Sequence, residues 1–160
     1  MSLVHVERDY DAHSLLLVAE FDAGIERVWQ LWADPRRLER WWGPPSHPAT
    51  FEQHELTAGG RATYFMTGPD GERSHGWWRV TEVDPPRALA FTDGWATGDG
   101  PTTDVDVQLT ERDGRTRMEL RFRFASREHM DQLDRLGAFD VFPQSVAQMD
   151  AVLANDHEET

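Results

Sequence analysis

The spacing of apolar residues changes twice along the chain. An apolar run over 14–21, bounded by polar residues, predicts a strand. Four apolar residues then recur at intervals of three and four, which predicts a helix with one buried face: Ile25, Val28, Trp29 and Trp32. Between 49 and 124 apolar and polar positions alternate, as in strands, and after Phe124 the helical spacing returns. The predicted order is therefore strand, helix, sheet, helix.

Helix signals follow the first strand. Asp22 is expected to cap the first helix. Asp34-Pro35 predicts the start of a second, short helix, because aspartate suits the N-cap and proline the first helical position. Gly43-Pro44-Pro45 ends that helix. Two short helices thus separate the first strand from the rest of the sheet.

Turn residues divide the alternating region into strands. We predict six of them, over 49–56, 61–67, 73–83, 87–92, 103–111 and 115–124. Asp113-Gly114 indicates a two-residue hairpin loop. Its register pairs apolar residues on one face (Leu109 with Met118, Val107 with Leu120, Val105 with Phe122) and opposite charges on the other (Asp106 with Arg121, Asp104 with Arg123). The apolar face is expected to be the inner one.

The other hairpin signal, Asp70-Gly71, does not show which face is inner. A two-residue loop there pairs Tyr64 with Trp77, Met66 with His75, Thr63 with Trp78 and Phe65 with Gly76. Both faces then carry large aromatic side chains. The alternation therefore leaves the inner face of strand 73–83 undecided.

The last forty residues predict a long helical segment with an interruption. Ser126 is expected to cap it, and its first apolar face contains Met130, Leu133 and Leu136. Gly137 and Pro143 predict a kink or break within 137–143. A second apolar stripe follows: Phe142, Val146, Met149, Val152 and Leu153. The elements together predict one α+β domain, 1–160, in which a curved antiparallel sheet of about seven strands wraps around the C-terminal helix.

Composition narrows the chemistry. The 160 residues contain no cysteine and, counted along the sequence, no lysine, which excludes disulfides, thiol nucleophiles and Schiff-base catalysis. A net charge of −13 disfavours nucleic acid and anionic membranes as partners. No apolar run approaches the roughly 18 residues of a membrane span, and no secretory signal is recognisable. We therefore expect a cytoplasmic protein without a membrane span. Seven tryptophans indicate an aromatic-rich core or an aromatic-lined cavity.

Several motifs occur together in a family-specific order. The first is Val28-Trp29-x-x-Trp32-x-x-Pro35-x-x-Leu38-x-x-Trp41-Trp42-Gly43-Pro44. Gly59-Gly60, Asp70-Gly71 and then Gly76-Trp77-x-x-Val80-x-Glu82-Val83-Asp84-Pro85-Pro86-Arg87-x-Leu89-x-Phe91-Thr92 follow it. Over roughly 14–154 the chain resembles the heat-shock-protein-90 ATPase activator-like domains of the START-like, or SRPBCC, superfamily. The resemblance implies a helix-grip fold, in which a concave sheet covered by the last helix leaves a cavity, but it transfers no function by itself.

No catalytic or metal-binding motif stands out. The spacing of the seven histidines, including His47 and His54, lacks a dense metal-ligand pattern, so we predict neither a metal site nor a cofactor. No serine lies in a G-x-S-x-G motif. Glu55 and Glu82 are the strand carboxylates that alternation could turn inward, although an outer-face position is favoured for both.

Aromatic and thioether side chains provide the candidate ligand-binding residues. They are Trp41, Tyr64, Met66, His75, Trp77, Trp95, Met118, Phe122, Phe142 and Met149. In this hypothesis Tyr64, His75 and Trp77 supply polar groups and the others form apolar walls, with Trp95 as a lid or a dimer contact.

Three functions are compatible with this sequence. The first is a binding protein for a hydrophobic small molecule held between the sheet and the C-terminal helix. The second is an enzyme on the same scaffold, resembling polyketide cyclases or hydrolases, which needs a titratable group inside the cavity. The third is a chaperone cofactor or other protein-interaction module, which needs an exposed apolar patch. Homodimerisation is compatible with all three.

Overall fold

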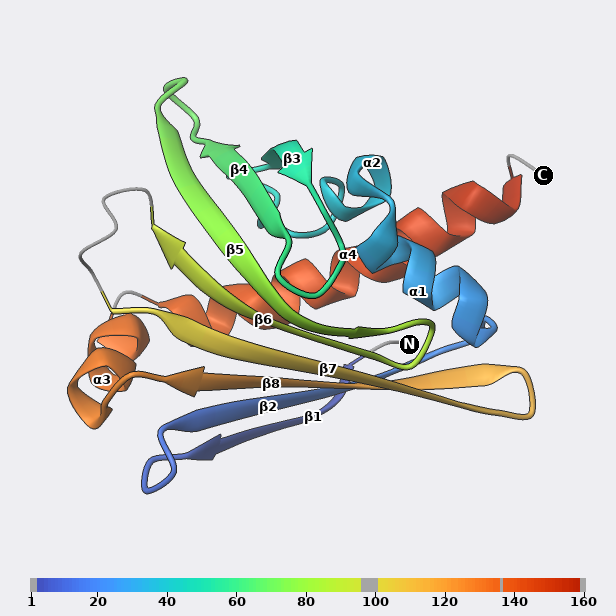
Figure 1. Cartoon of the computed structure of the whole chain (residues 1–160), viewed down its shortest axis with the longest axis horizontal. Helices are drawn as coiled ribbons and strands as arrows, with labels where there is room; N and C mark the ends of the chain where they lie inside the picture. Colours follow the sequence, from blue (N-terminus) through green and yellow to red (C-terminus); the bar gives the residue numbers. More distant parts are fainter. Residues whose placement is uncertain (1–2, 96–100, 136, 159–160) are drawn as a thin grey trace.

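The computed structural model describes residues 3–95, 101–135 and 137–158. These residues form one antiparallel sheet of eight strands, in the order β1-β2-β8-β7-β6-β5-β4-β3. The strands are β1 (Leu3–Asp9), β2 (Ser14–Phe21), β3 (Ala49–His54), β4 (Arg61–Thr67), β5 (Arg73–Asp84), β6 (Ala88–Trp95), β7 (Thr103–Arg112) and β8 (Arg115–Phe124). The helices are α1 (Ile25–Ala33), α2 (Pro35–Leu38), α3 (Arg127–Arg135) and α4 (Ala138–Glu158). In Figure 1 the sheet is strongly twisted and α4 runs along one side of it.

The α+β helix-grip architecture predicted from the sequence is confirmed. The sheet contains one strand more than predicted, because β1 pairs with β2 at one edge. The two short helices consequently follow the second strand rather than the first. Val6 on β1 is 40% exposed, which agrees with the weak apolar pattern of this edge strand.

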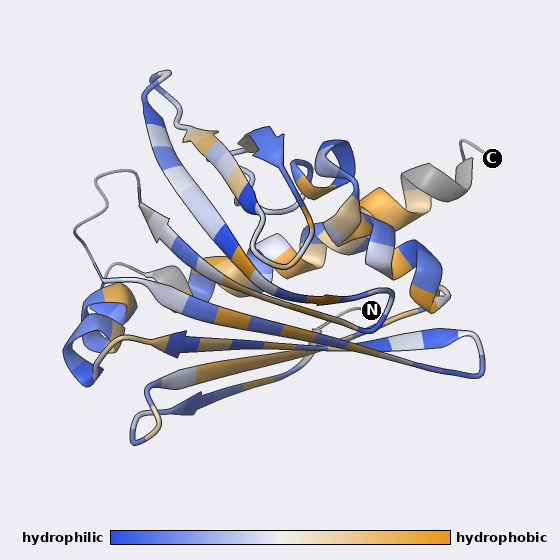
Figure 2. Cartoon of the chain, in the orientation of Figure 1, coloured by the Kyte–Doolittle hydropathy of each residue, from blue (hydrophilic) through white to orange (hydrophobic). Residues whose placement is uncertain are grey.

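The β7–β8 hairpin has the predicted register. Val105 lies opposite Phe122, and Asp106 lies opposite Arg121. Asp113 and Gly114 both adopt positive φ angles, of 55° and 79°, as a type I′ turn requires. Figure 2 shows the resulting alternation of apolar and polar residues along β7. The apolar face of this hairpin lies in the core.

The predicted register of the β4–β5 hairpin is wrong by one residue. Tyr64 lies opposite Gly76, and Thr63 lies opposite Trp77. The amide of Gly71 donates to the carbonyl oxygen of Gly68 at 3.0 Å, so the turn spans 68–71 and is centred on Pro69-Asp70 instead of Asp70-Gly71. The locked φ of Pro69 suits the second position of such a turn. Because side chains alternate, this slip places Trp78 inside and Trp77 outside.

Two helix starts differ in how they are capped. Asp34 accepts a hydrogen bond from the amide of Arg36 at 2.9 Å, as predicted for α2. The predicted cap of α1 is wrong, since the N-cap is Gly24, which has no side chain to accept a hydrogen bond. The amide of Ile25 donates instead to Glu111 Oε2 of β7 at 2.7 Å. An acidic side chain from a distant strand thus satisfies the start of α1.

The C-terminal segment is interrupted where the sequence predicts it. Ser126 caps α3, since its hydroxyl oxygen accepts from the amide of His129 at 3.0 Å. Gly137 separates α3 from α4 with a φ of 82°, a conformation that glycine adopts freely. Pro143 lies inside α4, which continues to Glu158. Leu136 lies outside the described residues.

Four indole rings and one phenyl ring form the centre of the core beside α1, and we call them the indole cluster. Its members are Trp32, Trp41, Trp42, Trp78 and Phe91. The rings of Trp78 and Phe91 stack with centroids 3.9 Å apart, and Trp32 meets Trp41 edge-on at 4.6 Å. In the described part of the chain, no helix combines the length and the apolar composition that crossing a bilayer requires.

Candidate ligand-binding pocket

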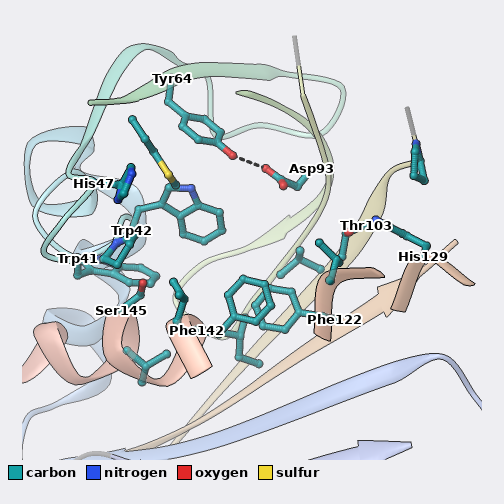
Figure 3. A pocket seen from close by; sticks show the side chains of 18 residues that line it. Trp41, Trp42, His47, Tyr64, Asp93, Thr103, Phe122, His129, Phe142 and Ser145 are labelled. Carbon is teal, nitrogen blue, oxygen red and sulfur yellow. Dashed lines mark hydrogen bonds between the residues drawn. The ribbon is translucent and has the colours of Figure 1, made fainter. Parts of the chain in front are cut away.

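A pocket of ≈ 280 Å³ lies between the sheet and α4, next to the indole cluster. Strands β4, β6, β7 and β8, helices α3 and α4, and the segment after α2 all contribute side chains to it. Figure 3 shows Tyr64 and Asp93 on one side of this space, with Phe142 and Ser145 of α4 on the other. The concave sheet and its covering helix therefore enclose a hollow, as the fold predicts.

The polar side of the pocket is a hydrogen-bonded pair. The hydroxyl of Tyr64 donates to Asp93 Oδ1 at 2.8 Å. Strand β5 separates the strands of these two residues in the sheet, and Gly76 of β5 lies opposite Tyr64. A Cβ at Gly76 would lie only 2.5 Å from Tyr64 Cζ, so the missing side chain lets the phenol ring lie across β5 and reach Asp93.

Both members of this pair titrate abnormally. Burial raises the pKa of Asp93 from its ordinary 3.8 to about 7, although hydrogen bonding by Tyr64 and by the indole of Trp78 acts in the opposite direction. Burial, followed by the nearby charge of Asp93, raises the pKa of Tyr64 well above 10. Tyr64 is therefore a neutral donor, whereas Asp93 exchanges a proton close to neutral pH.

Hydrogen bonds hold the aromatic side of the pocket in place. The indole N–H of Trp41 donates to the carbonyl oxygen of Leu31 at 2.8 Å. Gln148 Nε2 of α4 donates to the carbonyl oxygens of Trp41 and Gly43, at 3.3 Å and 2.7 Å. These bonds join α4 to the segment that carries Trp41 and Trp42. The wall that they form is therefore fixed relative to the helix.

The remaining walls are mainly apolar. The rings of Phe122 and Phe142 stack with centroids 4.5 Å apart and join β8 to α4. His129 lines the pocket from α3, and its Nδ1 accepts from the amide of Ala125 at 3.4 Å. Burial lowers the pKa of His129 below 6.5, which favours the neutral ring. The pocket thus combines apolar walls with few polar groups, as small-molecule sites do.

Five of the ten predicted ligand-binding residues line this pocket: Trp41, Tyr64, Met66, Phe122 and Phe142. Met118 and Met149 are fully buried in the core. His75 is exposed, and Trp77 covers Gly94 on the face of the sheet away from the pocket. The shifted hairpin register accounts for both positions. The side chain of Trp95 lies outside the described residues.

Sequence reasoning did not include Asp93, Gly76 or Gln148 in the site. Asp93 follows Leu89 and Phe91 at intervals of two, and both of these are buried, so the alternation does place its carboxyl inside. The predicted strand ended at 92, three residues before the end of β6 at Trp95, and so excluded Asp93. Glu55 and Glu82, the carboxylates considered instead, are exposed.

A second hollow lies on the surface along the β7–β8 hairpin. Two of its arginines pair with neighbouring carboxylates: Arg115 contacts Asp22 at 2.8 Å and Arg117 contacts Glu20 at 3.6 Å. We therefore place the candidate site in the pocket beside α4.

Comparisons with known proteins agree with this geometry. The model of the family described as "Activator of Hsp90 ATPase homolog 1-like protein" matches residues 22–154. A protein of Arthrobacter aurescens is 46% identical with a TM-score of 0.91, over 95% of this chain and 92% of the other. A protein of Mycobacterium smegmatis is 44% identical with a TM-score of 0.87, over 97% and 99%. The AHSA1 protein of Silicibacter pomeroyi is 27% identical with a TM-score of 0.72, over 90% and 99%. None of the curated proteins matches the sequence.

Proposed function

The chain belongs to the family of Activator of Hsp90 ATPase homolog 1-like proteins, in the SRPBCC superfamily, and from this premise we propose that it binds a small hydrophobic molecule. The fold is a scaffold for hydrophobic ligand binding. The ligand would lie between the sheet and α4.

One observation supports this proposal above the others. The indole cluster fills part of the space under the sheet, yet ≈ 280 Å³ beside it stays open. Phe122, Phe142 and Leu120 contribute apolar surface to that space, and Tyr64 and Asp93 contribute polar atoms on one side. Transfer of an apolar molecule from water into such a space is favourable by about 25 cal/mol per Å² of buried apolar surface.

Thermal unfolding with a panel of apolar compounds tests the proposal. A compound that binds the native state must raise the melting temperature. Val141 of α4 lines the pocket, so Val141→Trp fills it, whereas Ala147 of the same helix is exposed and Ala147→Trp serves as the matched control. We expect compounds to stabilise the wild type and Ala147→Trp, but not Val141→Trp. No stabilisation of the wild type, or equal stabilisation of Val141→Trp, would contradict the proposal.

A polyketide-cyclase-like or hydrolase-like enzyme is the second candidate, and Asp93 is the observation that favours it. A carboxyl with a pKa of about 7 inside an apolar pocket fits a general acid or base. Incubation with a metabolite extract, followed by mass spectrometry, distinguishes the two functions. An enzyme depletes a compound catalytically and loses this ability in Asp93→Asn, whereas a binding protein retains compounds unchanged.

The protein-interaction function has less support. Among the described side chains, Val6 is the large hydrophobic residue that is exposed, and one residue does not form a patch. Homodimerisation stays a prediction, which light scattering at several concentrations tests.

A further inference from the structure

Asp93 is an unusual group to find in this pocket. It is part-buried, and its Oδ1 accepts from a neutral phenol. Within the described part of the chain, neither an arginine nor any other carboxylate lines the pocket, and no ion pair involves Asp93. The chain also contains no lysine. A carboxylate in apolar surroundings is unfavourable unless a cation pairs with it.

Two other carboxylates have arginine partners at the surface. Asp106 on β7 contacts Arg123 at 3.0 Å, and Asp22 contacts Arg115 at 2.8 Å. Asp93 instead points toward the space that a ligand would occupy (Figure 3). The two histidines that line the pocket, His47 and His129, form no ion pair with Asp93 among the described residues, so its counter-charge can come from the ligand.

We propose that the ligand is an amine: an apolar body, such as one aromatic ring on a short chain, with one protonated nitrogen that pairs with Asp93. This inference rests on the proposed function and names the ligand class of the same pocket. Phe122 and Phe142 contact the apolar body, and Asp93 accepts from the ammonium group while Tyr64 keeps the carboxyl in position.

Two further properties of the protein agree with a cationic ligand. The net charge of −13 raises the local concentration of cations and repels anions. Burial raises the pKa of Asp93 to about 7, so pairing with an ammonium group moves the carboxyl to its charged form at neutral pH.

A series of three probes with one apolar body tests the ligand class. Calorimetric titration at pH 7.5 would use 4-phenylbutylamine, 4-phenylbutanol and 4-phenylbutyrate. We expect the amine to bind at least tenfold more tightly than the alcohol, and the carboxylate to bind most weakly. Asp93→Asn should remove the preference for the amine and leave the affinity for the alcohol within about threefold.

Asp104→Asn is the matched control. Asp104 is exposed on β7, where it accepts from Thr92 Oγ1 at 2.9 Å, and its loss changes the net charge as much as the loss of Asp93. The amine preference should survive in Asp104→Asn. If the alcohol binds as tightly as the amine, or if Asp93→Asn retains the preference, the amine inference is wrong and the hydrophobic-ligand function stands. If none of the three probes binds, both proposals fail.

Discussion

The indole cluster and the pocket lie side by side under the same sheet, and they differ in how the inward positions are filled. Along β5 these positions are Val80, Trp78 and Gly76, and along β6 they are Leu89, Phe91 and Asp93. On each strand, the inward position next to the large aromatic residue is therefore a glycine (Gly76) or a carboxyl (Asp93). The cluster is closed because its rings interlock. Next to it, the ring of Tyr64 lies across Gly76, and Tyr64 and Asp93 border the open pocket.

The two regions also differ in the hydrogen bonding of their buried polar atoms. The indole N–H of Trp32 is buried without a hydrogen-bond partner among the described residues, whereas those of Trp42 and Trp78 lie next to Tyr64 and Asp93. Leaving such a group unpaired costs about 1–3 kcal/mol. In the pocket, the polar atoms of Tyr64 and Asp93 pair with each other. Ring packing therefore dominates in the cluster, whereas hydrogen bonds fix the positions of the polar groups in the pocket.

Removing one ring from each region should give the largest difference in the free energy of unfolding. Trp78 is fully buried and contacts several rings, so Trp78→Ala should lower the free energy of unfolding by about 3–5 kcal/mol. Phe142 is half-buried and already borders open space, so Phe142→Ala should have a smaller effect. Urea unfolding measures both. Equal losses would show that the pocket side is packed as tightly as the cluster.

A methyl group at Gly76 should displace the ring of Tyr64, which lies between the indole cluster and the pocket. The added Cβ would overlap the ring of Tyr64, so Gly76→Ala should destabilise the protein by about 1–3 kcal/mol through overpacking. It should also break the hydrogen bond to Asp93. Gly71→Ala is a poor control because its φ is 84°, whereas Ala62→Gly tests a neighbouring inward position without adding atoms. Unchanged stability of Gly76→Ala would contradict the proposed path of the Tyr64 ring.

Asp93→Asn should stabilise the protein by about 1–2 kcal/mol at pH 8. The folded-state pKa of Asp93 is raised from 3.8 to about 7, so the folded state binds this proton more tightly than the unfolded chain. The contribution of this proton to the free energy of unfolding is fully present below pH 3.8 and is lost as the pH rises through 7. Asparagine can still accept from Tyr64 and has no charge to bury. The stability difference between variant and wild type should therefore grow between pH 4 and pH 8.

The comparison with the wild type is needed because other titratable groups lie near Asp93 and also change the stability with pH. Tyr64, His47 and His129 face the same pocket, and they are present in both proteins. Their contributions therefore cancel in the comparison. A constant difference across the pH range would show that Asp93 titrates normally.

Replacing His54 should give the smallest change in stability. Its dependence on pH is opposite to that of Asp93. Its Nε2 lies 3.0 Å from the carbonyl oxygen of Trp32, its ring meets Trp78 edge-on, and burial lowers its pKa below 6.5. The unfolded chain therefore takes up this proton first, and stability falls as the pH drops below 6.5. We expect His54→Gln to reduce this acid loss by up to about 1 kcal/mol in urea unfolding at pH 5 and pH 8. His129, whose pKa is also lowered, accounts for part of the remaining loss.

The parts of the fold with one clearly apolar face could be predicted from the sequence. The β7–β8 register followed from two faces of different character and from a turn that tolerates positive φ angles. The β4–β5 register did not follow, because both faces carry aromatic residues and Pro69 moves the turn by one position. Where polarity does not distinguish the faces, the turn decides the register.

The candidate site was less predictable than the fold. Tyr64 and Phe142 were identified as aromatic residues near the expected cavity, but Asp93 was missed because the predicted strand ended at 92, before the end of β6 at Trp95. The open volume depends on how the rings of Trp42, Tyr64 and Trp78 pack against one another. Sequence spacing does not contain that information, because it records which residues face inward and not how far their side chains reach.

The central claim is that the interior contains a closed indole cluster beside an open, ligand-accepting pocket. Nuclear magnetic resonance titration of the labelled protein with n-butylbenzene tests it residue by residue. We predict saturable shifts of the amide signals of Leu120, Phe122, Val141 and Phe142, and little change at Val28 and Leu31 behind the cluster. Absence of saturable shifts, or shifts centred on α1, would contradict the account.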